Sequence, residues 1–239
     1  MTLRSVSGGC GTALTALVLV VSVLLLTGCA GPWNPVRGTL SPTATPPAST
    51  TAVRSPAPEA VTDIFVSATS IELRDASGKT LSTFDYFQPA SEVVAGLSQA
   101  LGSAPILDNF EGRNDVPPTT RYEWGGFLLN DPLTGGMPPF SSNTWVRVSS
   151  EAVNGVRIST VDGIAVGDSA ADLEARYPDT SFRHPLAGQS ELHIGVGFVP
   201  LPPSDDYVGS ELTFSVQLFA RDPLGPITQL TTPSPNWGA

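Results

Sequence analysis

The feature that most constrains this chain is a change of composition near residue 60. Residues 30–60 contain seven Pro and eight Ser or Thr, and an apolar stretch lies before them. A segment of this composition cannot bury enough apolar surface to offset the entropy lost on ordering, so we expect residues 29–60 to form a disordered tether. Folding is therefore expected in residues 61–239. A domain of that length can bury a sufficient core without disulfides or metal.

The first 28 residues have the organisation of an export signal. Arg4 supplies a positive charge, and the 14 residues Ala13–Leu26 form an apolar stretch that small residues follow. As a helix this stretch would be about 21 Å long, against a hydrocarbon core of about 30 Å. We therefore predict a cleaved signal segment at residues 1–28. The alternative is an uncleaved anchor helix.

The end of this segment adds a second signal. Leu26-Thr27-Gly28-Cys29 resembles the lipobox of bacterial lipoproteins, in which an aliphatic residue and two small residues precede the modified cysteine. The resemblance implies that diacylglycerol (palmitate or similar chains) is attached to Cys29, with cleavage before it. The protein would then be lipid-anchored on the outer face of the cytoplasmic membrane. The only other cysteine is Cys10, inside the removed segment, so we expect no disulfide.

Charge narrows the range of partners. Residues 61–239 hold 21 acidic and 9 basic residues, a net charge of −12. Proteins that bind nucleic acid normally carry a basic face, so we expect no nucleic-acid partner. The sequence has no phosphate-binding loop and no paired cysteine motif, and it predicts no cofactor and no metal.

Within residues 61–239 the sequence predicts short strands and two helices. Val94, Leu97 and Leu101 recur at helical spacing, which predicts a helix over 90–101. A second helix is expected at 170–177, with Ser169 as its cap. The strands expected are 64–67, 69–74, 79–86, 106–110, 120–124, 127–129, 144–149, 156–161, 181–184, 191–199, 211–220 and 226–230. Asn154-Gly155 predicts a two-residue hairpin turn.

This order predicts an α+β fold with antiparallel sheets and one helix packed per half, the halves being 61–150 and 151–239. In each half a helix precedes a run of strands, as in two tandem helix-plus-meander modules. In the second helix we expect Leu173 and Tyr177 to face inward. Asp172, Glu174 and Arg176 should face water. The C-terminal residues 232–239 are expected to fray.

Residues 162–178 carry a resemblance of their own. The segment DGIAVGDSAADLEARYP resembles a block in uncharacterised actinobacterial lipoproteins, where a glycine-rich start precedes a short helix. The helix-then-meander layout is similar to the modules of the β-lactamase-inhibitor-protein and outer-membrane-assembly lipoprotein folds. These resemblances imply the α+β layout and bring no catalytic motif with them. Fold alone does not give function.

Two groups of residues could carry chemistry. Gly167-Asp168-Ser169 resembles the nucleophile block of GDSL-type esterases, so Ser169 with His184 or His193 is a candidate hydrolase site. The competing interpretation, which we favour, is that Ser169 only caps the second helix. Glu191, His193 and His184 are a thin set of metal ligands without the spacing of known zinc motifs, and surface polar residues are the better interpretation.

A third group consists of aromatic residues. Tyr122, Trp124 and Trp145 would form a binding patch if they were exposed together, next to the long loop 131–139; the alternative is that they belong to the core. We therefore expect a surface-tethered binding or interaction module rather than an enzyme, with an envelope protein or glycan as its partner. The alternatives are a small-ligand carrier and the Ser169 hydrolase.

Overall fold

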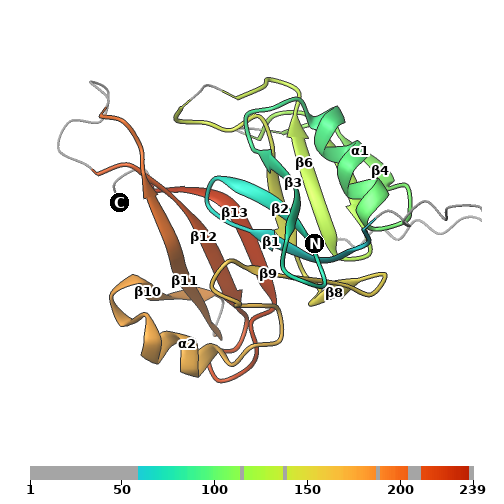
Figure 1. Cartoon of the computed structure of the whole chain (residues 1–239). Coiled ribbons are helices and arrows are strands. Elements are labelled where there is room, and N and C mark those ends of the chain that lie inside the picture. The colour runs from blue at the N-terminus through green and yellow to red at the C-terminus, as the bar shows by residue number, and fades with distance from the viewer. Residues whose placement is uncertain (1–58, 114–115, 137–138, 187–188, 204–210, 237–239) are drawn as a thin grey trace, which may run out of the picture. The chain divides into compact units, whose positions relative to one another are not determined.

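The computed structural model describes residues 59–236, except 114–115, 137–138, 187–188 and 204–210 (Figure 1). The expected signal segment 1–28, Cys29 and nearly all of the tether lie outside these residues. The first strand begins at Val61, where the sequence places the start of the folded region.

The described residues are mostly β, with two helices and two antiparallel-rich sheets, an arrangement compatible with the α+β class (Figure 1). The helices are α1 (Ala90–Ala100) and α2 (Ala170–Arg176), and a 3-10 turn follows at Pro178–Thr180. The five-stranded sheet consists of β1 (Val61–Val66), β2 (Ser70–Asp75), β3 (Thr80–Asp85), β8 (Ala152–Val153) and β9 (Val156–Thr160). The eight-stranded sheet consists of β4 (Ile106–Phe110), β5 (Thr119–Trp124), β6 (Phe127–Pro132), β7 (Trp145–Val148), β10 (Ser181–Leu186), β11 (Gln189–Pro200), β12 (Thr213–Ala220) and β13 (Gln229–Asn236).

The strand order shows how the two sheets are assembled. In the five-stranded sheet the order is β3-β2-β1-β9-β8, and the central pair of β1 and β9 is parallel. The expectation of purely antiparallel sheets is therefore wrong for this pair, which joins residues about 95 positions apart in the sequence. The eight-stranded sheet is antiparallel throughout, in the order β10-β11-β12-β13-β7-β6-β5-β4. It consists of two consecutive meanders that meet where β13 pairs with β7.

Helix α1 forms where the apolar spacing predicts it. Pro89 precedes its first turn, and Glu92 complements the positive end of the helix dipole. Leu97 and Leu101 are fully buried, whereas Val94 is only partly buried because Val93 takes the inward position. Gly102 ends the helix with a φ of 65°, the left-handed conformation that glycine adopts without strain.

Helix α2 also begins as predicted, with one correction. The Ser169 Oγ accepts a hydrogen bond from the Asp172 N–H at 3.3 Å, and Leu173 is buried while Tyr177 is partly buried against the core. Glu174 does not simply face water. Its carboxylate accepts two hydrogen bonds from the Arg183 guanidinium, at 3.0 and 2.8 Å. The helix is therefore tied to strand β10 by a bidentate ion pair.

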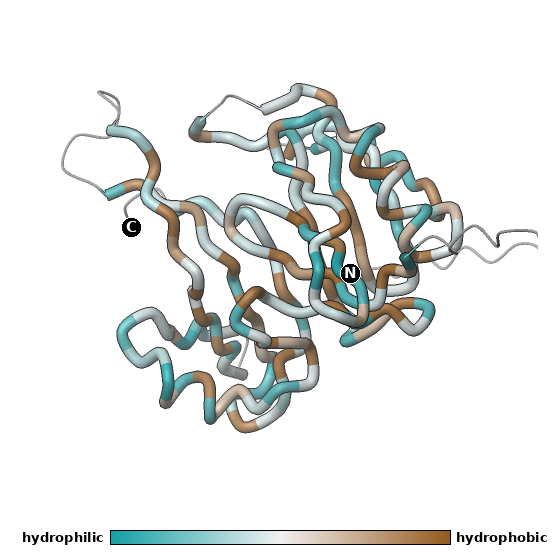
Figure 2. Tube along the Cα trace, in the orientation of Figure 1, coloured by the Kyte–Doolittle hydropathy of each residue, from teal (hydrophilic) through white to brown (hydrophobic). Residues whose placement is uncertain are grey.

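One continuous core joins both sheets and both helices. It includes Ile64 of β1, Leu97 of α1, Phe127 of β6, Leu173 of α2 and Leu218 of β12, all among the buried side chains. Figure 2 shows apolar and polar residues mixed along the strands, as expected for strands that present one face to a core.

The C-terminal residues differ from the expectation of fraying. Strand β13 runs to Asn236, and Thr232 is fully buried. The Thr232 hydroxyl donates to the Ser67 carbonyl at 2.6 Å, and the buried Tyr86 hydroxyl donates to the same oxygen at 3.2 Å. Burial raises the pKa of Tyr86, so this hydroxyl stays protonated and remains a donor. The Ser67 carbonyl thus connects the two sheets.

Candidate functional site

The three aromatic residues of the predicted patch do not share one exposed surface. Trp124 is 2% exposed, its indole N–H donates to the Ser103 carbonyl at 3.1 Å, and its ring meets Phe127 edge-on at 6.3 Å. Tyr122 packs against the same core, and its partial burial raises the pKa of its hydroxyl. Both residues therefore contribute to the core, which was the alternative to an exposed binding patch.

Trp145 lies on the other face of the same sheet. It pairs with Asn130, whereas its neighbour Val146 pairs with Leu129 and is fully buried in the core. Because successive residues of a strand point to opposite faces, Trp145 points away from Trp124 and Tyr122. Of the three predicted residues, Trp145 alone remains a candidate for binding.

The face that carries Trp145 is here called the outer face of the eight-stranded sheet. None of its side chains belongs to the core that joins the two sheets. Cross-strand pairing places the following residues on this face: Arg121, Glu123, Leu128, Asn130, Trp145, Arg147, Thr231, Gln217, Phe219, His193 and Phe182. The outer face is thus an extended mixture of aromatic, amide and charged side chains.

A hollow of about 390 Å³ opens beside Trp145. Its walls are mainly aromatic and proline side chains, including Phe140, Phe214, Pro132 and Pro233. The long loop 131–139 contributes Thr134 and Gly135. This lining is typical of sites that bind apolar or extended ligands with a few directional polar contacts.

The two histidines also lie on the outer face. The His193 ring packs between Phe182, at 4.8 Å, and Phe219, at 4.6 Å, and its Nε2 lies 3.2 Å from the Glu191 carboxylate. The His184 ring is 6.0 Å from that of His193. Within the described residues no three His, Cys, Asp or Glu side chains are close enough to hold a metal ion. The rings of Phe182, His193 and Phe219 form a packed row, with the His184 ring beside it.

Ser169 has a structural role in α2. Besides accepting the Asp172 N–H, it bridges to Pro226, and the Ala170 N–H donates to the Gly225 carbonyl at 3.0 Å. In the part of the chain that the structure describes, Ser169 makes no hydrogen bond to His184 or His193. The arrangement needed to activate a serine nucleophile does not form there.

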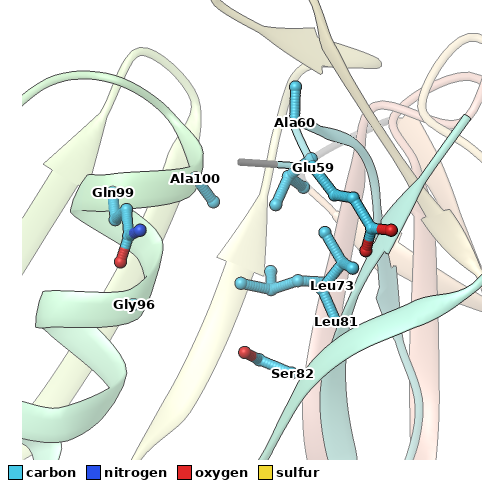
Figure 3. A pocket seen from close by; sticks show the side chains of 9 residues that line it. Glu59, Ala60, Leu73, Leu81, Ser82, Gly96, Gln99 and Ala100 are labelled. Carbon is cyan, nitrogen blue, oxygen red and sulfur yellow. The ribbon is translucent and has the colours of Figure 1, made fainter. Parts of the chain in front are cut away.

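A second hollow, of about 550 Å³, lies between α1 and the five-stranded sheet. Figure 3 shows Leu73 and Leu81 pointing from the sheet toward Ala100 of the helix. Glu59 lies at its edge and forms an ion pair with Lys79 at 2.7 Å, a hydrogen bond that raises the pKa of Lys79. This half-apolar groove is where the small-ligand alternative could be placed.

Comparison with known proteins assigns neither a family nor a function to the chain. No protein-family model matches the chain, and no match was found among curated proteins or solved structures. Across the described residues, neither helix is long and apolar enough to span a membrane.

Proposed function

We propose that this protein is a lipid-anchored lipoprotein on the outer face of the cytoplasmic membrane, where it acts as a non-enzymatic binding module. The anchor rests on the lipobox-like Leu26-Thr27-Gly28-Cys29 directly after an apolar stretch. Two acyl chains anchor stably, because each buried CH₂ contributes about 0.8 kcal/mol. The proline-rich residues 30–60 act as a spacer that holds the domain away from the membrane.

The binding role rests on one observation above all, the hollow beside Trp145 on the outer face. A tryptophan that takes no part in the core, next to a proline-rich wall, provides the aromatic anchor that binding sites use. Its partner is an envelope protein or glycan, and no nucleic acid is expected on a domain of this acidity.

We also propose that the domain consists of two tandem modules, each with one helix packed on its own half. The order of elements supports this, because α1 precedes the meander β4–β7 and α2 precedes the meander β10–β13. The joint between β7 and β13 and the parallel pair of β1 and β9 would then form the interface between the modules.

The alternative is a small-ligand carrier that uses the groove between α1 and the five-stranded sheet. An apolar fluorescent probe would test it. Displacement of a groove-bound probe by an envelope lipid extract, abolished by Leu81→Trp, would favour the carrier over the binding module. The hydrolase alternative has less support, since Ser169 caps α2.

The anchor and the binding role are tested separately. Cys29→Ala should release the protein from the membrane fraction or leave it unprocessed, and unchanged fractionation would contradict lipidation. For binding, the full chain is cross-linked on intact envelopes, and wild type is compared with Trp145→Ala. Recovery of the same cross-linked species from both proteins, or of none from either, would contradict a site at Trp145.

A further inference from the structure

A separate hollow of about 490 Å³ lies on the outer face over strands β10 to β13. Its lining includes Asp179, Phe182, Gly195, Phe198, Gln217 and Ser234. The sequence gives no motif for this site, because its residues come from five elements that meet only in the folded sheet.

One of the residues that line the hollow, Gln217, carries an unused hydrogen-bond donor. The Gln217 Nε2 is buried and has no hydrogen-bond partner among the described residues. By contrast, the Nε2 of Gln229 on the same face is paired, because it donates to the Thr231 hydroxyl at 3.1 Å. Buried polar groups in proteins are normally paired, so the Gln217 amide marks a position for an acceptor from outside.

Two phenylalanine side chains also line this hollow. Phe182 is 52% exposed and Phe198 is 43% exposed, and neither belongs to the core. Neighbours nevertheless hold both rings. The Phe182 ring packs against that of His193 with the centroids 4.8 Å apart and the planes tilted by 53°. Phe198 lies within a β-bulge and over Gly195, where an added Cβ would come within 2.5 Å of the ring. Ordered, exposed aromatic faces favour a ligand with an apolar C–H surface.

The hydroxyl groups around the rings are acceptors. Thr180 donates to the Gly195 carbonyl at 2.8 Å, Ser181 to Tyr177 at 2.7 Å and Ser215 to Ser234 at 3.3 Å. Each hydroxyl oxygen therefore keeps lone pairs for a donor from outside. Asp179 is the one ionisable side chain among the described lining residues, so the hollow carries negative charge.

These properties define the ligand. It must supply a hydrogen-bond acceptor to Gln217, and donors to the Thr and Ser hydroxyls and to Asp179. Hydroxyl groups on a ligand can do both, whereas an ammonium group can only donate. It must also offer an apolar face to the phenylalanine rings and carry no negative charge next to Asp179. We propose that this hollow binds a neutral saccharide unit. The hollow is within the usual size range for small-molecule sites.

This inference rests on the proposed binding role, since it names an envelope glycan as one of the ligands of the outer face. It concerns a different hollow from that of Trp145. The two hollows are lined by different parts of the sheet, and among their described lining residues they share Ser234 and Pro235. A single chain could thus hold a glycan in one hollow and a second partner in the adjoining one.

The test uses the full chain in detergent and immobilised neutral oligosaccharides of hexose and N-acetylhexosamine, with sulfated forms of the same sugars as the charged counterpart. Wild type should be retained by a neutral oligosaccharide and not by its sulfated form. Phe182→Ala and Phe198→Ala should each weaken retention by about tenfold, equivalent to about 1.4 kcal/mol. Gln217→Ala should also weaken it, whereas Gln229→Ala should bind as wild type does.

Gly195→Ala keeps the test decisive if a phenylalanine variant fails to fold. Its added methyl group should push the Phe198 ring aside and reduce retention, with the thermal unfolding midpoint nearly unchanged. Absence of retention on every neutral sugar, retention that survives Phe198→Ala and Gln217→Ala, or equal binding of sulfated forms would overturn the inference. Trp145→Ala separates the two proposals. If envelope cross-linking depends on Trp145 but no sugar is retained, the binding role stands and the saccharide site fails.

Discussion

The Asn154 side chain caps helix α1 from 53 positions further along the chain: its amide donates to the Leu101 carbonyl at 2.8 Å. Asn154 also occupies the predicted hairpin turn between β8 and β9, with a φ of 51°. Asparagine is one of the few residues other than glycine that tolerate this left-handed conformation. The same residue therefore shapes the turn and satisfies a carbonyl that the helix end leaves unpaired.

The two roles of Asn154 can be separated by substitution. Asn154→Gly keeps the turn and loses the cap, which should lower the free energy of unfolding by about 1 kcal/mol. Asn154→Asp tolerates the turn but places a negative charge at the carbonyl end of the helix, so it should destabilise more. Urea denaturation measures both. If Asn154→Gly is as stable as wild type, the hydrogen bond to Leu101 contributes nothing.

The opposite directions of the two tryptophans give a second prediction. Trp124→Ala removes a buried ring and should cost about 3–5 kcal/mol. Trp145→Ala, on the outer face, should cost much less while abolishing envelope cross-linking. Thermal unfolding of both variants checks the difference. Similar losses of stability would mean that Trp145 is a structural residue, contrary to the proposed site.

Leu173 is the larger of the two buried side chains of α2, so its truncation tests the packing of that helix. Leu173→Ala should lower the free energy of unfolding by about 2–5 kcal/mol. Ala175 is exposed on the same helix, and Ala175→Ser serves as the matched control with little expected effect. Chemical denaturation that shows equal stability for the two variants would contradict the packing of Leu173.

Ser169→Ala distinguishes a capping serine from a catalytic one. Loss of the 3.3 Å hydrogen bond from Asp172 should cost about 1 kcal/mol, with binding of any ligand unchanged. Denaturation and esterase assays on the same preparation provide the measurement. A variant of unaltered stability that loses an esterase activity present in wild type would restore the hydrolase interpretation.

The ion pair between Glu174 and Arg183 predicts a dependence on pH. The hydrogen bonds from Arg183 lower the pKa of Glu174, and Glu174 in turn raises the pKa of Arg183. A carboxylate with a lowered folded pKa adds stability above its unfolded pKa, and this stability is lost as pH falls through the folded value. Glu174→Gln should therefore be slightly less stable than wild type at pH 7, and the difference should disappear in acid.

Salt and a control substitution complete that experiment. Because Arg183 is half exposed, the contribution is small and should shrink further at high ionic strength. Glu151→Gln, at an exposed position, is the control. A stability difference for Glu174→Gln that persists unchanged in acid would show that the side chain acts through packing rather than charge.

Local sequence signals were sufficient for the helices and the hairpin. The apolar spacing around Leu97 and the Ser169 cap give α1 and α2, and Asn154-Gly155 gives the turn at β8–β9. Each of these features depends on residues within one or two turns of chain. The interactions that determine these features are therefore local in the sequence.

Local sequence signals could not predict the pairings between distant strands. The parallel pair of β1 and β9 and the joint of β7 with β13 depend on which strands meet in the folded core. The face of Trp145 depends on register, since a shift of one residue moves a side chain to the other face. The hollow proposed to bind a saccharide could not be predicted from the sequence for the same reason. Phe182 and Gln217 are 35 positions apart in the sequence, and only the sheet brings them together.

The position of β13 has a consequence for how the protein is made. This strand lies in the middle of the eight-stranded sheet, between β12 and β7, yet it is the last described strand to emerge during synthesis. Until residues 229–236 are available, the two meanders have no shared strand and the Ser67 carbonyl lacks its Thr232 donor. Folding of the eight-stranded sheet should thus be delayed until residues 229–236 have been synthesised. A nonsense mutation before Gln229 would leave two unjoined sheets with exposed edges, a product for proteases to clear.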